Sequence, residues 1–249
     1  MLPEERRQKI MELLTKNKSV FVKDLSEEFN VSDETIRRDF TLLESEGKLK
    51  KAHGGAYINT TVKNDIPINI RESIFKENKD YIGQLCAKEI KDGDTIFIDA
   101  STTAYYILPH IRHLDNVTII TNSLKVAEYA AIYNPFDFML IGGKYDPITR
   151  SFLGPDTEIL LASYFADKAF ISCRGLSEKG ITDGNIAQGI IRQKMIKNSK
   201  KTYLILDNTK FDLTSLYLIG DLDLIDYFIT DKKPSDKYID LLKDQNLIY

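Results

Sequence analysis

Apolar residues recur along the N-terminal part of the chain with the spacing of three and four that is typical of amphipathic helices. Pro3 and the two acids after it predict the start of a first helix, and Ile10 and Leu13 mark its apolar face. A short β-branched run at 20–22 predicts an extended connector, and residues 23–29 predict a second, shorter helix. This part of the chain is therefore expected to form a small helical domain.

A third predicted helix carries two contrasting faces. Ser32 is a suitable N-cap, and Gly47 is a typical residue just beyond a helix end. On a helical wheel, the buried stripe consists of Ile36, Phe40 and Leu43. The opposite, exposed face consists of Thr35, Arg38 and Thr41, with Arg37 on its flank. A short helix, a tight turn and a helix with an exposed Arg/Thr face predict a helix-turn-helix, whose second helix reads the major groove.

The basic, alternating segment Lys48–Gly55 predicts a β-hairpin wing next to DNA phosphates. The predicted DNA-contacting residues are Ser32, Thr35, Arg37, Arg38, Thr41, Lys48, Lys50, Lys51 and His53. Asp39 leans toward the buried side of its helix, so it is expected to orient an arginine or cap a core contact rather than touch DNA. The plainer alternative is a three-helix bundle whose Arg and Lys side chains are merely solvated.

From residue 76 onward, short apolar strands alternate with helices. The expected strands are 95–98, 117–120, 136–141, 168–172, 202–206 and 224–230. The expected helices are 82–90, 102–111, 124–133, 157–164, 186–198 and 237–243. This alternation predicts an α/β sandwich with a mainly parallel sheet. Residues 58–75 lack clear periodicity, so the predicted organisation is a domain at 1–57, a linker at 58–75 and a domain at 76–249.

Polar residues follow the expected strands at their carboxyl ends, where open α/β sheets bind ligands. Hydroxyls and free backbone N–H groups at 101–103 lie at the N-terminus of a predicted helix, which suits a phosphate. The predicted ligand-binding residues are Asp99, Ser101, Thr102, Thr103, Thr121, Asn122, Gly142, Gly143, Arg174 and Lys210. Each has a plainer alternative: Asp99 and Ser101 as helix caps, the glycines as a turn, and Lys210 as a solvated side chain.

The composition is that of an ordinary globular protein of two domains, with 249 residues, 43% of them hydrophobic, 29% charged, and a net charge of −3. No apolar run approaches the ~18 residues of a membrane helix, and the first residues lack the apolar stretch of a signal peptide. A cytoplasmic location without a membrane partner is therefore expected. Acidic and basic residues are equal in number over 1–57, so DNA binding depends on how the basic groups are arranged.

Metal and cofactor chemistry find no support in the motifs. Two cysteines, Cys86 and Cys173, exclude a disulfide scaffold and a cysteine-based zinc site. His110 and His113 lack a third ligand nearby and are interpreted as surface histidines. The sequence contains no glycine-rich dinucleotide or phosphate-binding loop and no serine nucleophile elbow. We therefore expect no metal, no nicotinamide cofactor and no nucleotide hydrolysis.

Several strings of residues point to one family. The N-terminal strings are Val31-Ser32, Thr35-Ile-Arg-Arg-Asp39 and His53-Gly-Gly-Ala56. The C-terminal strings are Phe97-Ile-Asp99-Ala-Ser-Thr-Thr103, Thr121-Asn-Ser-Leu124, Leu140-Ile-Gly-Gly143 and Leu206-Asp207 with Lys210-Phe211. Over about residues 6–57 and 76–232, the chain resembles the DeoR family of bacterial transcriptional regulators.

The resemblance implies a winged helix-turn-helix that binds operator DNA, and a second domain similar in fold to ribose-5-phosphate isomerase that senses a phosphorylated sugar or a related catabolite. The chain differs from the family pattern in two places. Many members carry an acidic residue shortly before a helical Lys, where this chain has Gln188 and then Arg192. Arg174 and Ser177 stand in a loop where other members place small or acidic residues.

The function expected from these observations is a repressor of carbohydrate-catabolism genes that a sugar phosphate releases from its operator. Such modules gain contacts by pairing, so a homo-oligomer, either a dimer or a tetramer, is expected. The alternative from another class is a sugar-phosphate isomerase-like enzyme with an accessory DNA-binding module. No residue spacing singles out a general base, so catalysis is not expected. An activator would share every residue with a repressor.

Overall fold

The structure is a computed structural model that describes residues 1–17, 19–52, 54–57, 71, 75–133 and 136–249. The chain divides into two compact units, Met1–Lys76 and Glu77–Tyr249. The expected linker at 58–75 lies almost wholly outside the described residues. None of the described helices is long and apolar enough to cross a membrane.

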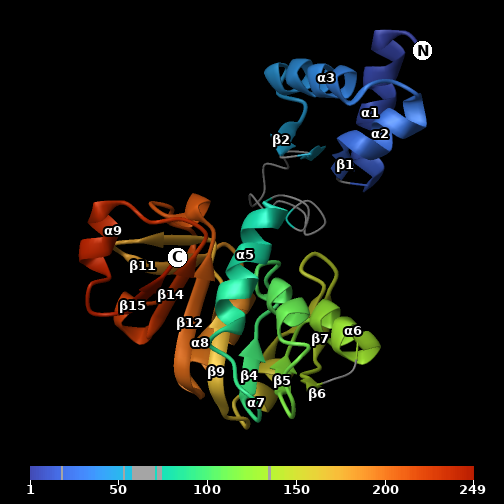
Figure 1. Ribbon diagram of the computed structural model, residues 1–249. Coiled ribbons are helices and arrows are strands. Elements are labelled where there is room, and N and C mark those ends of the chain that lie inside the picture. The colour runs from blue at the N-terminus through green and yellow to red at the C-terminus, as the bar shows by residue number, and fades with distance from the viewer. Residues whose placement is uncertain (18, 53, 58–70, 72–74, 134–135) are drawn as a thin grey trace. The chain divides into compact units, whose positions relative to one another are not determined.

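Over residues 1–57, the described part of the first unit comprises helices and a small antiparallel sheet (Figure 1). Its elements are α1 (Pro3–Asn17), β1 (Ser19–Phe21), α2 (Val22–Phe29), α3 (Asp33–Ser45), β2 (Lys50–Ala52) and β3 (Gly55–Tyr57). The expected hairpin wing is confirmed, since β2 and β3 pair antiparallel. The segment expected as a plain connector is strand β1, which pairs with β3 and completes a three-stranded sheet of order β1-β3-β2.

The buried stripe of α3 is confirmed, and it packs against the apolar faces of α1 and α2. Ile36, Phe40 and Leu43 are buried with Ile10 and Leu25 in one cluster. At the start of α3 the Ser32 side chain accepts a hydrogen bond from the backbone N–H of Thr35, as the expected N-cap requires. The core therefore fixes which face of α3 is left to solvent.

The second unit is built on a seven-stranded sheet of order β15-β14-β12-β9-β4-β5-β6, in which every neighbouring pair is parallel. These strands are β4 (Thr95–Ile98), β5 (Thr118–Thr121), β6 (Asp137–Leu140), β9 (Ala166–Ile171), β12 (Ser199–Leu206), β14 (Tyr227–Thr230) and β15 (Asn246–Ile248). The helical segments are α5 (Lys76–Ala87), η1 (Ala104–His110), α6 (Leu124–Tyr133), α7 (Pro155–Leu161), α8 (Ile186–Lys197), η2 (Asn208–Lys210), η3 (Leu222–Leu224) and α9 (Asp236–Leu241). The expected α/β fold with a mainly parallel sheet is thus confirmed.

Helices cover both faces of this sheet, as a parallel sheet requires. Ile96 and Ile98 of β4 belong to one apolar cluster, with residues of α5, η1 and α6. Phe97 of the same strand belongs to the other cluster, with residues of α7, α8 and α9. The alternation of side chains along β4 therefore divides the core into two layers.

β15 was not predicted from the sequence. Five short strands outside the parallel sheet were not predicted either. They are β7 (Lys144–Asp146), β8 (Ser151–Leu153), β10 (Gly175–Ser177), β11 (Gly180–Asp183) and β13 (Tyr217–Gly220). The first two form a hairpin, and the other three form an antiparallel sheet of order β10-β11-β13. With only three or four residues each, they are too short to show a period in the sequence.

The helix expected at 102–111 is a shorter 3₁₀ helix, η1. Pro109 lies inside it and has no N–H to donate to a preceding turn. The Ser101 hydroxyl accepts a hydrogen bond from the backbone N–H of Ala104, so residues before Ala104 form a turn at the end of β4. This turn contains the residues predicted to bind phosphate.

Candidate functional site

The exposed face of α3 carries two arginines with only local partners. Arg38 is 80% exposed at its side chain, and its Nε lies 3.3 Å from Glu34 Oε1, one turn earlier. Arg37 Nη2 lies 3.6 Å from Asp33 Oδ2 in the same arrangement. Ion pairs of this exposed i,i+4 type contribute little to stability. Both guanidinium groups are therefore free to exchange their carboxylate partner for a phosphate or a base edge.

Asp39 holds this helix against the rest of the unit. Its side chain is buried, with Oδ2 2.5 Å from Arg6 Nε and Oδ1 3.6 Å from Arg7 Nη1. The expectation that Asp39 orients an arginine is confirmed, but the arginines belong to α1 rather than to α3 itself. A buried carboxylate between two guanidinium groups fixes the orientation of α3 without using its exposed face.

The hydroxyl residues of α3 are occupied within the protein. Ser32 Oγ and Thr35 Oγ1 lie 2.9 Å apart, and Thr35 is half-buried. Thr41 Oγ1 donates to the carbonyl of Arg37 and accepts from Lys51 Nζ at 3.2 Å. These three residues lie on or beside the face that carries the arginines.

The wing is fastened to α3 through one carboxylate. Glu44 Oε1 accepts from the backbone N–H of Lys51 at 2.8 Å, and Oε2 lies 3.3 Å from Lys51 Nζ. The backbone hydrogen bond from Lys51, assisted by its ammonium group, lowers the pKa of Glu44 against the opposing effect of burial. Lys48 pairs with Glu46, and Lys50 is exposed. His53, the last predicted contact on the wing, lies outside the described residues.

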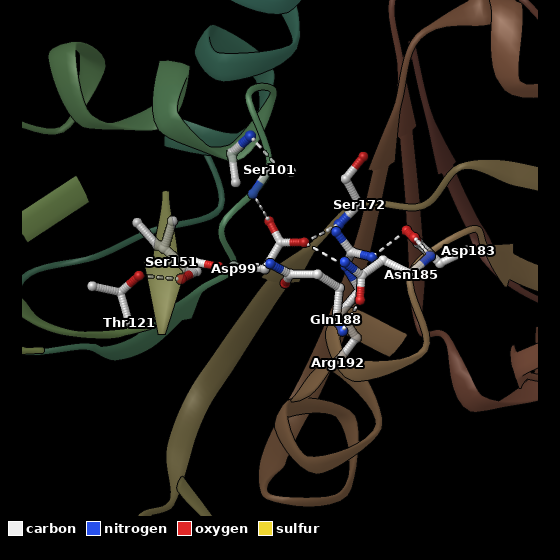
Figure 2. Close-up of polar contacts among 11 residues, drawn as sticks. Asp99, Ser101, Thr121, Ser151, Ser172, Asp183, Asn185, Gln188 and Arg192 are labelled. Atoms are coloured by element: carbon white, nitrogen blue, oxygen red, sulfur yellow. Dashed lines mark hydrogen bonds and ion pairs between the residues drawn. The ribbon is translucent and has the colours of Figure 1, made fainter. Parts of the chain in front are cut away.

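In the second unit, Asp99 is the centre of a buried polar cluster (Figure 2). One carboxylate oxygen accepts from the backbone N–H of Ser101 at 3.0 Å. The other accepts from the backbone N–H of Ser172 at 3.0 Å and from Arg192 Nε at 2.7 Å. These bonds tie the ends of β4 and β9 to α8. Asp99 is thus held by three donors of the protein itself.

Arg192 is the residue that completes this cluster. Its side chain is only 6% exposed, and it pairs with Asp183 as well as with Asp99. Burial alone would lower the pKa of Arg192, but the charges of Asp183 and Asp99 outweigh burial and raise it. The sequence marked Arg192 as a departure from the family pattern without placing it beside Asp99. In the sequence, Arg192 shares a helical face with the apolar residues Ile191 and Met195, and this position could have indicated that Arg192 is buried.

The turn after β4 offers two free backbone donors. The backbone N–H of Ser101 is used by Asp99, and that of Ala104 is used by Ser101. Among the described residues, no hydrogen bond is recorded for the backbone N–H of Thr102 or of Thr103. Adjacent free N–H groups at the start of a helical turn suit an anionic oxygen.

After β5, Thr121 and Asn122 are fully buried. The Thr121 hydroxyl donates to the carbonyl of Ile98 and accepts from the backbone N–H of Ser123, so it joins β5 to β4. Asn122 Nδ2 donates to the carbonyl of Phe152 at 2.9 Å. Thr121 therefore holds the carboxyl ends of β4 and β5 together, whereas Asn122 links the end of β5 to β8.

Packing requires a glycine at Gly143, the second glycine of the pair after β6. A Cβ on Gly143, whose φ is +147°, would lie 2.1 Å from Thr157 Oγ1 of α7. The Thr157 hydroxyl donates to the carbonyl of Gly142 at 2.9 Å. An added Cβ on Gly142, in contrast, would meet no atom within 4 Å. The structure thus gives Gly143 a role in docking α7 and leaves open space beside Gly142.

The last two predicted ligand-binding residues are half-buried. The backbone N–H of Arg174 donates to the carbonyl of Thr182, just before β10. Lys210 Nζ lies 4.0 Å from Asp207 Oδ2 in η2. Each residue follows a strand of the parallel sheet, β9 for Arg174 and β12 for Lys210.

Burial leaves both cysteine thiols protonated rather than activated. Burial raises the pKa of the Cys173 thiol to about 12, which keeps it protonated. The pKa of Cys86, which is fully buried, is likewise raised. Among the described residues, no group of three or more His, Cys, Asp or Glu side chains is placed to hold a metal ion.

Two family models match the chain. A DeoR-like helix-turn-helix domain matches residues 6–62, and a DeoR C-terminal sensor domain matches residues 74–232. The second match covers more than half of the chain and includes the Asp99–Arg192 cluster. The first includes the exposed face of α3 and the wing.

Three relatives are similar along nearly their whole length. An uncharacterized HTH-type transcriptional regulator of Bacillus subtilis, YulB, is 36% identical over 99% of this chain and 96% of its own. The HTH-type transcriptional repressor GlcR of Bacillus subtilis is 34% identical, with coverage of 99% and 95%. The lactose phosphotransferase system repressor of Lactococcus lactis is 30% identical, with coverage of 96% and 95%.

Among solved structures, ribose 5-phosphate isomerase of Methanocaldococcus jannaschii is similar over 55% of this chain and 54% of that chain. The sequence identity of the two is 16%, and the TM-score is 0.40.

Proposed function

The chain belongs to the DeoR family and is a DNA-binding transcriptional regulator, and from this premise we propose that it represses carbohydrate-catabolism genes until a phosphorylated sugar releases it. Two relatives support the direction of control and the class of genes. One is named a transcriptional repressor and another a repressor of a lactose phosphotransferase system.

The observation that carries the DNA-binding half of the proposal is the exposed α3 face. Arg37 and Arg38 have only weak partners on their own helix, while Asp39 anchors that helix from its buried side. An exposed arginine on a recognition helix binds guanine O6 and N7 through two hydrogen bonds. Lys48, Lys50 and Lys51 of the wing then contact phosphates, and their contribution falls with rising salt.

The sensing half rests on the turn after β4. The free backbone N–H groups of Thr102 and Thr103 bind the phosphate of the effector, and the neighbouring strand ends bind its sugar. The effector releases DNA because it binds the released conformation more tightly. By linkage, operator DNA weakens effector binding by the same factor. Two copies of the chain pair to read two half-sites.

The sensor acts without catalysis. An isomerase needs a general base at the substrate's C–H group. Asp99, the buried carboxylate of the site, accepts hydrogen bonds from Ser101, Ser172 and Arg192, so three of its about four lone-pair sites are already engaged. The proposal therefore predicts that the effector is recovered chemically unchanged.

The DNA-binding half is tested with Arg38→Ala on an operator selected from a random duplex library. We expect a loss of operator affinity of roughly 5- to 150-fold, since a bidentate contact to a base is worth about 1–3 kcal/mol. Arg150→Ala is the matched control, because Arg150 is an exposed arginine of the second unit that also pairs with one carboxylate. Unchanged operator affinity in Arg38→Ala would remove this residue from the reading face.

The sensing half is tested by thermal unfolding of the full chain with a panel of phosphorylated and free sugars. A ligand at about 100 times its Kd stabilises the folded state by roughly 2.7 kcal/mol, which raises Tm by a few degrees. Stabilisation by a phosphosugar that chromatography recovers unchanged supports sensing. Conversion of that compound to an isomer would establish the enzyme instead.

A further inference from the structure

Two buried oxygens near the predicted ligand site have no hydrogen-bond partner among the described residues. They are Asn122 Oδ1 and Gln188 Oε1. Asn122 is fully buried and Gln188 is 4% exposed. A buried acceptor without a donor is unfavourable, and most native structures avoid it unless a bound molecule supplies the donor. Two such oxygens in one region therefore point to a missing donor.

The orientation of the Gln188 amide follows from a chain of hydrogen bonds. The Thr149 hydroxyl donates to the carboxylate of Asp146 at 2.7 Å, so it has no proton left for Ser151. Ser151 Oγ, 2.8 Å away, must then donate to Thr149 and can only accept from Gln188. The nitrogen of the Gln188 amide consequently faces Ser151, as Figure 2 shows, and its oxygen is the end without a partner.

The orientation of the Asn122 amide is fixed in a similar way. Its Nδ2 donates to the backbone carbonyl of Phe152, which is an acceptor only. Ser151 and Phe152 are consecutive residues of β8, so the two amides attach to the same short strand from β5 and from α8. Both free oxygens are therefore acceptors, and neither amide can rotate to hide its oxygen without losing its own bond.

The charges around Gln188 favour a neutral donor over an anion. Arg192 stands one turn later on α8, but its charge is shared by the carboxylates of Asp99 and Asp183. This cluster of three residues carries one negative charge in excess. A phosphate or carboxylate placed against Gln188 Oε1 would meet an acceptor oxygen beside that excess negative charge. A hydroxyl group would meet a suitable acceptor.

We propose that Asn122 and Gln188 accept hydrogen bonds from hydroxyl groups of the effector and so determine its orientation. The hydroxyl-rich end of the sugar lies against these two amides, and the phosphate lies at the backbone N–H groups of Thr102 and Thr103. The inference rests on the proposed function, because it assigns the two ends of a sugar phosphate within that sensor. It makes Gln188 a specificity-determining residue for a polyhydroxylated, uncharged end, and it disfavours effectors that carry a carboxylate there.

The test compares Gln188→Met with Gln193→Met in the full chain. Gln193 is a matched control on the same helix whose amide is satisfied at both ends, by the carbonyl of Ile219 and by the hydroxyl of Tyr217. The probes are glucose 6-phosphate, fructose 6-phosphate, ribose 5-phosphate, the corresponding free sugars, and inorganic phosphate. Calorimetry gives Kd for each probe, and thermal unfolding gives Tm of the ligand-free protein.

We expect Gln188→Met to weaken the best phosphosugar about tenfold, the equivalent of one hydrogen bond of about 1.4 kcal/mol, without changing Kd for inorganic phosphate. Tm of the ligand-free protein should change by only a few degrees, because the substitution removes an unpaired acceptor together with one hydrogen bond. Gln193→Met should lower Tm by more than Gln188→Met does. It should leave the ratio of Kd for the phosphosugar to Kd for inorganic phosphate unchanged. A purely structural role for Gln188 would give the pattern of the control.

The outcomes separate the two proposals. Unchanged phosphosugar affinity in Gln188→Met overturns the hydroxyl subsite and leaves the sensor proposal intact. Equal weakening of inorganic phosphate and phosphosugar also overturns it, because Gln188 would then serve the phosphate. Binding of free sugars alone, lost in Gln188→Met, supports the subsite and contradicts a phosphorylated effector. If no sugar or phosphosugar binds the wild-type protein, both proposals fail.

Discussion

Arginine has opposite roles in the two units of the chain. Arg38 of α3 is exposed and pairs with a single carboxylate on its own helix. Arg192 of α8 is buried and pairs with two carboxylates, one of them 93 positions away in the sequence. The first can exchange its partner at little cost, whereas loss of the second would leave buried Asp99 and half-buried Asp183 without their counter-charge. The same side chain is therefore available to an outside partner in one unit and committed to the architecture of the other.

The largest loss of stability is expected from Arg192→Met, which leaves the buried Asp99 and the half-buried Asp183 without their cation. Removing one partner of a buried pair costs about 3–5 kcal/mol, so the free energy of unfolding should fall by that amount. Urea denaturation followed by circular dichroism measures it. Arg192→Lys, which keeps the charge, should lose less. A loss below about 1 kcal/mol in Arg192→Met would show that the two carboxylates find other partners.

A similar but smaller effect is expected from Asp39→Ala in the first unit. Arg6 is buried beside Asp39 and would lose its partner, while Arg7 is partly exposed and can turn to water. We expect a loss of about 3 kcal/mol in that unit's unfolding free energy. Asp33→Ala is the control, since its pair with Arg37 is exposed and should contribute under about 1 kcal/mol. Equal losses in the two variants would contradict the anchoring role of Asp39.

Arg37→Ala should change DNA binding but not stability. Removing one phosphate or base contact is expected to reduce the slope of log K against log salt by about 1 on a random duplex. The unfolding free energy should stay within about 0.5 kcal/mol of the wild type, as for most exposed substitutions. Fluorescence anisotropy at several salt concentrations gives the slope. An unchanged slope together with unchanged affinity would place Arg37 outside the interface.

The smallest expected effect is the pH-dependent contribution to stability of Glu44, which holds the wing to α3. The pKa of Glu44 is lowered in the folded state by the backbone N–H of Lys51, so its contribution to stability is present at neutral pH. That contribution should be lost as the pH falls below the ordinary carboxyl value, through the lowered folded-state pKa. Because Glu44 is partly exposed, we expect the first unit to lose less than about 1 kcal/mol. Glu44→Gln should flatten the pH dependence of amide exchange in β2, and an equally steep profile would argue against this carboxylate.

The difference between the two units also explains which features could be predicted from the sequence. The exposed face of α3 follows from local periodicity, because Ile36, Phe40 and Leu43 fix the buried side and leave Arg38 on the other. The parallel sheet follows in the same way from its apolar strands. These features depend on residues close together in the sequence, and they were predicted correctly.

The buried cluster around Asp99 depends on distant residues and was only partly predicted. Asp99 was identified from its place after β4, but Asp183, Gln188 and Arg192 were not included. Their roles arise only when α8 packs against the ends of β4 and β9, and no local pattern encodes that contact. The role of Gly143 was missed for the same reason, since the atom that approaches it belongs to Thr157.

The order of strands in the parallel sheet has a consequence for how the protein matures. In the first unit, the wing and the helices join segments close together along the chain, and such contacts form quickly. The central strand of the sheet is β9, which pairs with β4, Phe97 lying opposite Ala169. The two halves of the sheet therefore cannot join until β9 has been synthesised. Domains fold as units from the N-terminus during synthesis. The nascent chain therefore completes its DNA-binding domain before it completes the domain that senses the effector.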